Sequence, residues 1–92
     1  MTHTLIAHKF KLYIAGDAPN SLKAVANIKA FCLDYLASCH TIEIVDVLRH
    51  PEQALADGIL LTPTLVKVSP APICKIVGNL DNSRTVLETI GL

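Results

Sequence analysis

The sequence is poor in aromatic residues and has no tryptophan: two Tyr and two Phe make up 4% of its 92 residues. Because 51% of the chain is nevertheless hydrophobic, we expect a core built mainly from Ala, Val, Ile and Leu. A chain of this length has room for one core, so residues 1–92 are predicted to form a single domain. The large apolar fraction on a small body also favours self-association.

A surplus of charge of either sign is missing, since eight Lys and Arg residues balance eight Asp and Glu residues. This balance argues against a protein that binds phosphate backbones, and we expect no nucleic-acid partner. No apolar run approaches the roughly 20 residues that span a bilayer, so no membrane association is expected. The first four residues lack the pattern of a secretion signal, and a cytoplasmic protein is predicted.

Cysteine spacing typical of metal or redox sites is also missing. Cys32, Cys39 and Cys74 stand at unrelated positions, and we interpret them as reduced thiols that act as small hydrophobic residues. The four histidines show no ligand spacing with a cysteine or a carboxylate. No metal site and no cofactor are therefore predicted.

The hydrophobic pattern predicts alternating strands and helices. Strands are expected at residues 10–15, 41–48, 65–68 and 73–77, and helices at 21–36, 51–57 and 81–90. The nearly continuous apolar run at 41–48 is typical of a central strand. The first β-α-β unit requires parallel strands with a right-handed crossover. The order β-α-β-α-β-β-α therefore predicts an α/β, thioredoxin-like fold with a four-stranded mixed sheet between helices.

The turn GDAPNS at residues 16–21 lies where thioredoxin-type oxidoreductases hold a reactive thiolate, at the N-terminus of the first helix. It contains no cysteine, which excludes dithiol exchange at this position. We expect Gly16 to allow the turn and Asn20 or Ser21 to cap the helix. Activation of glutathione by Ser21 is the less favoured alternative. Leu22 and Leu33 are expected on the buried side of this largely covered helix.

Asp46 is a carboxylate inside an apolar strand, where burial would raise its pKa. Two interpretations compete: a hydrogen bond to nearby backbone at the end of the strand, which we favour, and a functional acid. Because no partner group is visible in the sequence, no catalytic residue is assigned.

Five fragments resemble the KaiB family of circadian clock proteins, in order and without gaps over about three quarters of the chain. They are KLYIAG, DAPNS, VDVLRHPEQA, LLTPTLVKV and PAPICKIVGNL. The resemblance implies a non-enzymatic protein that binds the ATPase ring of a KaiC-type kinase and modulates its phosphorylation. It also implies capture of a KaiA-type protein and displacement of a histidine kinase that carries a related domain. The chain departs from the family at Cys74, usually basic, and at Asn79, usually acidic.

The resemblance further implies that one sequence adopts two folds. One is thioredoxin-like, with a cis bond before Pro63; the other has the order β-α-β-β-α-α-β and self-associates. We expect the thioredoxin-like form here, because the family's acidic C-terminal tail does not follow before Leu92. A homo-oligomer (dimer or tetramer), or a monomer in the thioredoxin-like form, is expected. The residues tied to the switch or to its turns are Gly16, Pro63, Pro70, Pro72, Gly78 and Asn79.

Four lysines, Lys11, Lys23, Lys67 and Lys75, are the candidate partner-binding residues. Isolated charges of this kind usually face solvent and oppose edge-to-edge pairing of strands. The resemblance implies instead that they face an acidic surface of KaiC, with Lys23 and Lys75 as the first choices. A thioredoxin-like sensor, a glutathione-dependent redox domain and a plain oligomerisation module remain alternative functions, as does a non-clock paralogue.

Overall fold

The computed structural model of the chain describes residues 6–37 and 39–92. Its elements are β1 (His8–Ile14), α1 (Pro19–Tyr35), β2 (His40–Asp46), α2 (Pro51–Ala56), β3 (Thr64–Ser69), β4 (Cys74–Val77) and α3 (Ser83–Ile90). The predicted order β-α-β-α-β-β-α is thus confirmed.

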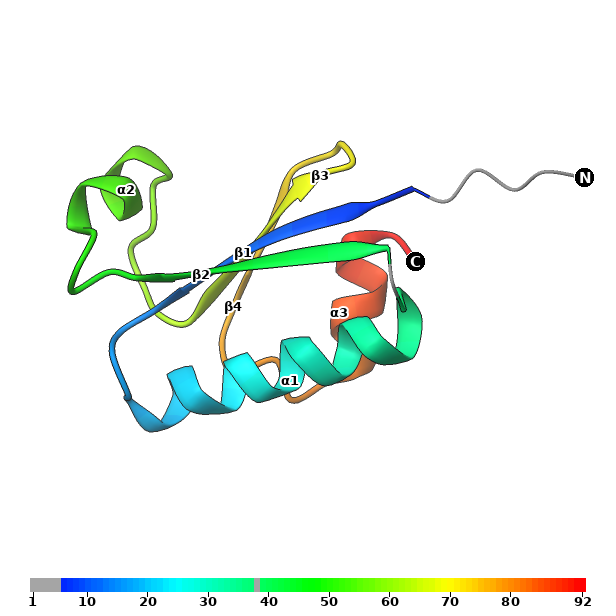
Figure 1. Cartoon of the computed structure of the whole chain (residues 1–92), viewed down its shortest axis with the longest axis horizontal. Helices are drawn as coiled ribbons and strands as arrows, with labels where there is room; N and C mark the ends of the chain where they lie inside the picture. Colours follow the sequence, from blue (N-terminus) through cyan, green and yellow to red (C-terminus); the bar gives the residue numbers. More distant parts are fainter. Residues whose placement is uncertain (1–5, 38) are drawn as a thin grey trace, which may run out of the picture.

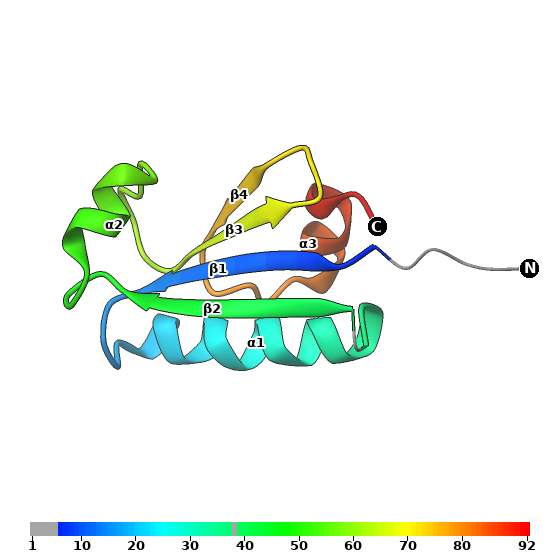
Figure 2. The same cartoon turned by 45° about the horizontal axis from the view of Figure 1, so that its top comes forward.

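The four strands form one mixed sheet in the order β2-β1-β3-β4 (Figure 2). β1 pairs with β2 in parallel, whereas β1 with β3 and β3 with β4 are antiparallel. The prediction of a central strand at 41–48 is wrong, because β2 lies at the edge of the sheet. Only Val45 of this strand is fully buried. An apolar, β-branched run favours a strand but does not fix its place in the sheet.

α1 and α3 cover the same face of the sheet (Figure 1). The main core lies between them and the strands, and its buried residues are Phe10, Leu12, Ala24, Ile28, Phe31, Cys32, Leu36, Leu65, Leu80, Val86 and Ile90. The opposite face carries only α2, at one end, where Ala54 packs against Tyr13, Val45 and Val66. The expected sheet between helices is thus found, but among residues 6–37 and 39–92 no other helix packs on this second face, and much of it stays open.

α1 begins at Pro19, and its N-cap is Ala18, which makes no side-chain capping bond. Proline suits this first position because its missing N–H would have no helical partner there. The predicted cap at Asn20 or Ser21 is therefore wrong. Leu22 and Leu33 are also more than half exposed, contrary to expectation. The buried face of α1 is formed instead by Ser21, Ala24, Ile28, Phe31 and Cys32.

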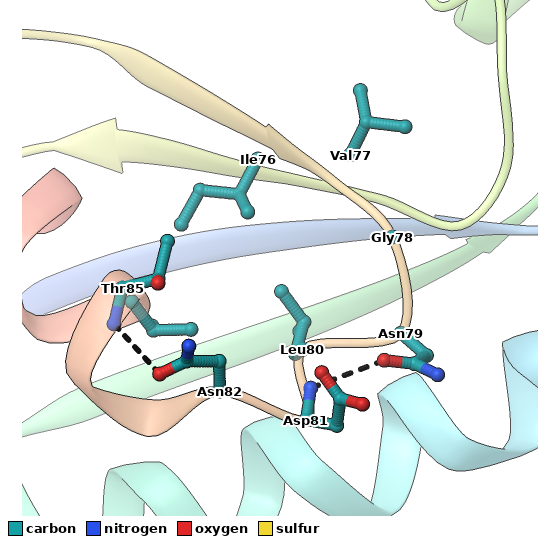
Figure 3. Close-up of a pocket in the computed structure, with 9 residues that line it drawn as sticks. Ile76, Val77, Gly78, Asn79, Leu80, Asp81, Asn82 and Thr85 are labelled. Carbon is teal, nitrogen blue, oxygen red and sulfur yellow. Dashed lines mark hydrogen bonds between the residues drawn. The ribbon is translucent and has the colours of Figure 1, made fainter.

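α3 begins with a side-chain cap, supplied by Asn82. The Oδ1 of Asn82 accepts a hydrogen bond from the backbone N–H of Thr85 at 3.2 Å, as Figure 3 shows. Gly91 closes the helix with a left-handed φ of 85°. In the preceding turn, the Oδ1 of Asn79 accepts the N–H of Asp81 at 3.1 Å. This turn connects the edge strand β4 to the helix that covers the core.

Replacing Asn82 with Ala is expected to lower the free energy of unfolding by about 1 kcal/mol, because the N–H of Thr85 loses its acceptor. Asn20→Ala is the matched control, since α1 has no side-chain capping bond. Urea unfolding followed by circular dichroism measures both. Equal destabilisation by the two substitutions would contradict the assigned cap.

Candidate partner-binding site

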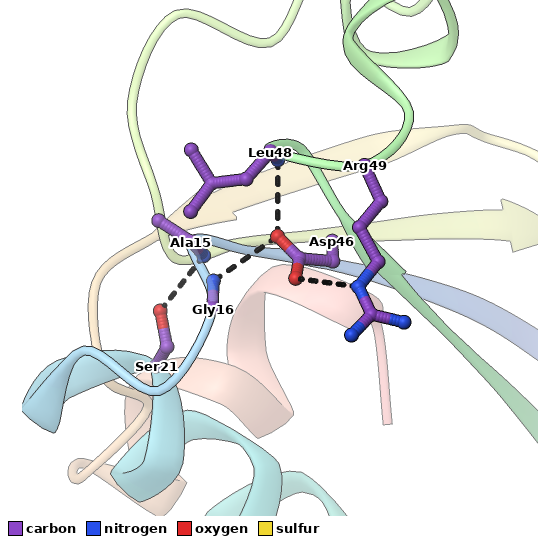
Figure 4. A network of polar contacts seen from close by, with 6 residues as sticks. All are labelled: Ala15, Gly16, Ser21, Asp46, Leu48 and Arg49. Carbon is purple, nitrogen blue, oxygen red and sulfur yellow. Dashed lines mark hydrogen bonds and ion pairs between the residues drawn. The ribbon is translucent and has the colours of Figure 1, made fainter.

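The turn before α1 is tied to the end of β2 by one carboxylate. The Oδ1 of Asp46 accepts the backbone N–H of Gly16 at 3.1 Å and that of Leu48 at 3.0 Å (Figure 4). The Nε of Arg49 lies 3.9 Å from Oδ2. These hydrogen bonds stabilise the charged form and lower the pKa of Asp46, which corrects the expected rise. The favoured interpretation of Asp46, a backbone hydrogen bond at the strand end, is confirmed.

Glycine suits position 16 because it adopts a left-handed backbone without strain. Its φ is +54°, and a Cβ placed there would lie 3.4 Å from the Cδ1 of Leu48.

The side chain of Ser21 is buried, and its Oγ accepts the backbone N–H of Ala15 at 3.1 Å (Figure 4). A buried hydroxyl engaged in this way has no access to glutathione, so the structure gives no support to that alternative.

The cysteines do not form a redox centre on this turn. Cys32 is buried in α1, and burial raises the pKa of its thiol to about 11. Because the thiolate is the nucleophile in disulfide exchange, such a thiol is unreactive near neutral pH. Cys39 and Cys74 are only partly buried, so the prediction of small buried hydrophobes holds fully for Cys32 alone.

The open face of the sheet carries a row of charged and apolar side chains. Glu43, Lys11, Val66 and Lys75 stand opposite one another across β2, β1, β3 and β4. Opposite residues on neighbouring strands share a face, and strands lie about 4.8 Å apart. Lys11 and Lys75 are therefore brought to the same surface, with Val66 between their strands.

Asp57, just after α2, contacts both lysines. Its Oδ2 lies 3.6 Å from the Nζ of Lys11 and also accepts a hydrogen bond from the hydroxyl of Tyr13. Its backbone carbonyl accepts a hydrogen bond from the Nζ of Lys75 at 2.7 Å. The bond from Tyr13 and the nearby ammonium of Lys11 lower the pKa of Asp57, whereas burial and this carboxylate raise the pKa of Tyr13 to about 12. Asp57 and Tyr13 are not among the residues predicted from the sequence, where they lie 44 positions apart.

Two cavities lie beside these residues, and Lys75 lines both. The first measures about 250 Å³ and is lined by Lys11, Asp57, Val66, Val68, Ile73 and Lys75. The second, about 200 Å³, is bordered by the loop 58–61 and by Val77. We call the two cavities together the lysine groove. Its apolar rim is open to solvent, since Ile73 is 68% and Val77 is 58% exposed.

The other two predicted lysines lie elsewhere. Lys67 faces the α1 and α3 side, is only 4% exposed, and donates a hydrogen bond from Nζ to the carbonyl of Ile90 at 3.0 Å. Its burial removes it from any partner surface in this fold and corrects that prediction. Lys23 is exposed on α1, which covers the face opposite to the lysine groove.

The predicted turn residues occupy the connections around β3 and β4. The Thr62–Pro63 bond is cis, and the carbonyl of Pro63 accepts the N–H of Gly78 at 2.9 Å. The carbonyl of Asn79 accepts a hydrogen bond from the Nδ2 of Asn27 on α1 at 2.8 Å. Pro70 and Pro72 lie between β3 and β4.

Neither a metal site nor a membrane span is found in the part of the chain that the structure describes. No group of three or more His, Cys, Asp or Glu side chains there is arranged to hold a metal ion. None of the described helices is long and apolar enough to cross a bilayer.

Comparison with known proteins places these features in a family. The KaiB domain model matches residues 11–92. The circadian clock oscillator protein KaiB of Rippkaea orientalis is 43% identical over 82 residues, which cover 89% of this chain and 77% of that protein. The circadian clock protein KaiB3 of Synechocystis sp. is 40% identical over 77 residues, or 84% of this chain and 76% of its own. The chain belongs to the KaiB family.

Solved structures confirm the thioredoxin-like fold of this KaiB family member. The N-terminal domain of SasA from Synechococcus elongatus superposes with a TM-score of 0.76, covering 98% of this chain and 89% of that one at 17% identity. Mitochondrial thioredoxin 3 from Saccharomyces cerevisiae gives 0.73, covering 95% and 80% at 16% identity. The predicted family and fold are thus both confirmed.

Asp46→Asn is expected to lower the free energy of unfolding at neutral pH, because a neutral amide accepts the two backbone hydrogen bonds less strongly. The depressed pKa of Asp46 means that this contribution is present above the unfolded-state pKa and is lost as the pH falls through the folded-state value. The difference from wild type should therefore shrink below about pH 4.

Urea unfolding across this pH range measures the effect, and Asp17→Asn, an exposed carboxylate of the same turn, is the control. A difference between wild type and Asp46→Asn that stays constant with pH would show that the charge of Asp46 does not contribute.

Proposed function

We propose that this protein is a non-enzymatic clock regulator that binds the ATPase ring of a KaiC-type kinase and thereby modulates its phosphorylation. The observation that carries the proposal is the lysine groove in a KaiB family member: Lys11 and Lys75 stand beside exposed apolar side chains on an uncovered sheet face. Uncovered apolar surface with a charged rim is typical of a protein-binding site. We place the protein in the cytoplasm, with a KaiA-type protein as a second partner.

The turn before α1 supports a binding role over a redox role. In this chain Asp46 holds the turn before α1 through the N–H of Gly16, and the buried thiol of Cys32 has a raised pKa. A thioredoxin-like fold keeps its shape here while the reactive group is missing from residues 16–21. The function therefore depends on surfaces, not on thiol chemistry.

We also propose that residues 50–92 exchange between the thioredoxin-like arrangement and the order β-α-β-β-α-α-β. Few side-chain hydrogen bonds and ion pairs join this segment to the first half of the described chain, and they involve Asn27 with Asn79, and Asp57 with Lys11 and Tyr13. If the binding-competent fold were populated at about 1%, the apparent affinity would fall about a hundredfold. Exchange of this kind would let the fold equilibrium regulate the partner.

Neutralising both groove lysines, Lys11→Gln with Lys75→Gln, is expected to weaken binding to the purified KaiC-type ATPase ring about tenfold, as two exposed charge contacts are lost. The matched control is Lys23→Gln on α1, for which we expect less than about a twofold change. Biolayer interferometry measures the dissociation constants. No binding of the wild-type protein to the ring would refute the proposed function, and a larger loss from Lys23→Gln would move the contact to α1.

NMR secondary-structure assignment of residues 50–92 tests the two arrangements. We expect shifts of α2, β3, β4 and α3 in the ring-bound protein. In the free protein we expect, beside the same shifts, a second set of signals with two successive helices and a final strand. A single thioredoxin-like set in both the free and the ring-bound protein, with no exchange to a second state, would contradict the proposed fold equilibrium.

A further inference from the structure

The lysine groove already holds one carboxylate, that of Asp57. Among residues 6–37 and 39–92, it is the one acidic group within ion-pair distance of a groove lysine. It lies at the rim of the larger cavity, beside Lys11 and Lys75. In the free protein, Lys11 therefore contacts the carboxylate of Asp57, and Lys75 contacts its backbone carbonyl.

The pair between Lys11 and Asp57 is suited to exchange. Its atoms are 3.6 Å apart, and the two side chains are 28% and 36% exposed. Partly exposed pairs at such distances are weak, because water screens them and a lysine side chain is free to turn away. The hydroxyl of Tyr13 and the carbonyl contact with Lys75 hold Asp57 and the end of α2 in place without this pair.

The apolar lining of the cavity is open beside the same two ammonium groups. Val66 is buried at its base, whereas Val68 and Ile73 face outward with 38% and 68% of their surface exposed. A cavity of about 250 Å³ has room for an apolar side chain. Because Lys11 and Lys75 stand at its rim, a negatively charged group of a partner is complementary to this cavity.

We propose that the lysine groove receives an acidic segment of the partner, in which a carboxylate stands beside a large apolar side chain. The apolar side chain fills the cavity over Val66, Val68 and Ile73, and the carboxylate replaces that of Asp57 on Lys11. Asp57 is then an internal competitor that weakens docking. The inference rests on the proposed function in taking the KaiC-type ATPase ring as the protein that supplies the segment.

Asp57→Asn tests the competition directly. The amide oxygen still accepts the hydroxyl of Tyr13 and the backbone carbonyl still accepts Lys75, so α2 stays in place while Lys11 is released. We expect the affinity for the ring to rise about two- to fivefold, the range set by one exposed ion pair. The rise should disappear when Asp57→Asn is combined with Lys11→Gln, because the released group is then absent.

Two further variants separate this effect from others. Glu52→Gln removes an exposed negative charge from the same short helix, away from the groove lysines, and controls for general charge. Tyr13→Phe removes the hydrogen bond that helps to hold α2 but leaves the carboxylate on Lys11, so the affinity should not rise. A rise of equal size in Glu52→Gln or Tyr13→Phe, or an unchanged or lower affinity in Asp57→Asn, would overturn the inference.

Methyl NMR locates the contact independently of affinity. On addition of the ring, the methyl signals of Val66, Val68 and Ile73 should shift or broaden. If the ring binds and these signals stay unchanged, the proposed function stands and the groove is not the docking site. If the wild-type protein does not bind the ring at all, the proposed function fails and this inference falls with it.

Discussion

The pairing of β1 with strands on both sides is the constraint on which the rest of the structure depends. Its register with β2 and β3 places Phe10 and Leu12 under α1 and α3, and it places Lys11 and Tyr13 on the opposite face. A shift by one residue would exchange the two sets, burying ammonium groups and exposing the core. One strand thus fixes both the stability of the fold and the position of the lysine groove.

The protein shares its fold with thioredoxins but differs from them in the turn before α1. A reactive helix N-terminus requires a thiolate that faces backbone N–H groups, whereas residues 16–21 before and at the start of α1 contain no cysteine. The N–H of Gly16 in this turn is bonded to Asp46. The network joins the turn to the end of β2, so the loop is a structural connection between two strands. The proposed function places recognition on the face on which β1 presents Lys11.

Local patterns in the sequence predicted the local structure well. The helices predicted at 51–57 and 81–90 agree within two residues with α2 (Pro51–Ala56) and α3 (Ser83–Ile90), because helix ends are set by residues that are close in sequence. Residues whose role depends on distant partners were not predictable in this way. The sequence predicts an exposed Lys67, whereas its Nζ is bonded to the carbonyl of Ile90. Asp57 accepts a hydrogen bond from Tyr13, which is 44 residues away in sequence. Ser21 was predicted to cap α1, but its Oγ accepts the N–H of Ala15 instead. A serine near the start of a helix is compatible with either role.

The buried ammonium of Lys67 constrains any exchange of the second half. Its Nζ is satisfied by the carbonyl of Ile90, which joins β3 to the end of α3 inside the core. Losing that acceptor while Lys67 stays buried would leave an unpaired charge away from water, at a cost of several kcal/mol by general estimates. β3 and α3 must therefore leave the core together. The backbone of β1 would then need another strand in place of β3, because its buried N–H and C=O groups require partners. The proposed exchange is consequently a cooperative replacement of one strand by another, and gradual fraying from the C-terminus would not achieve it.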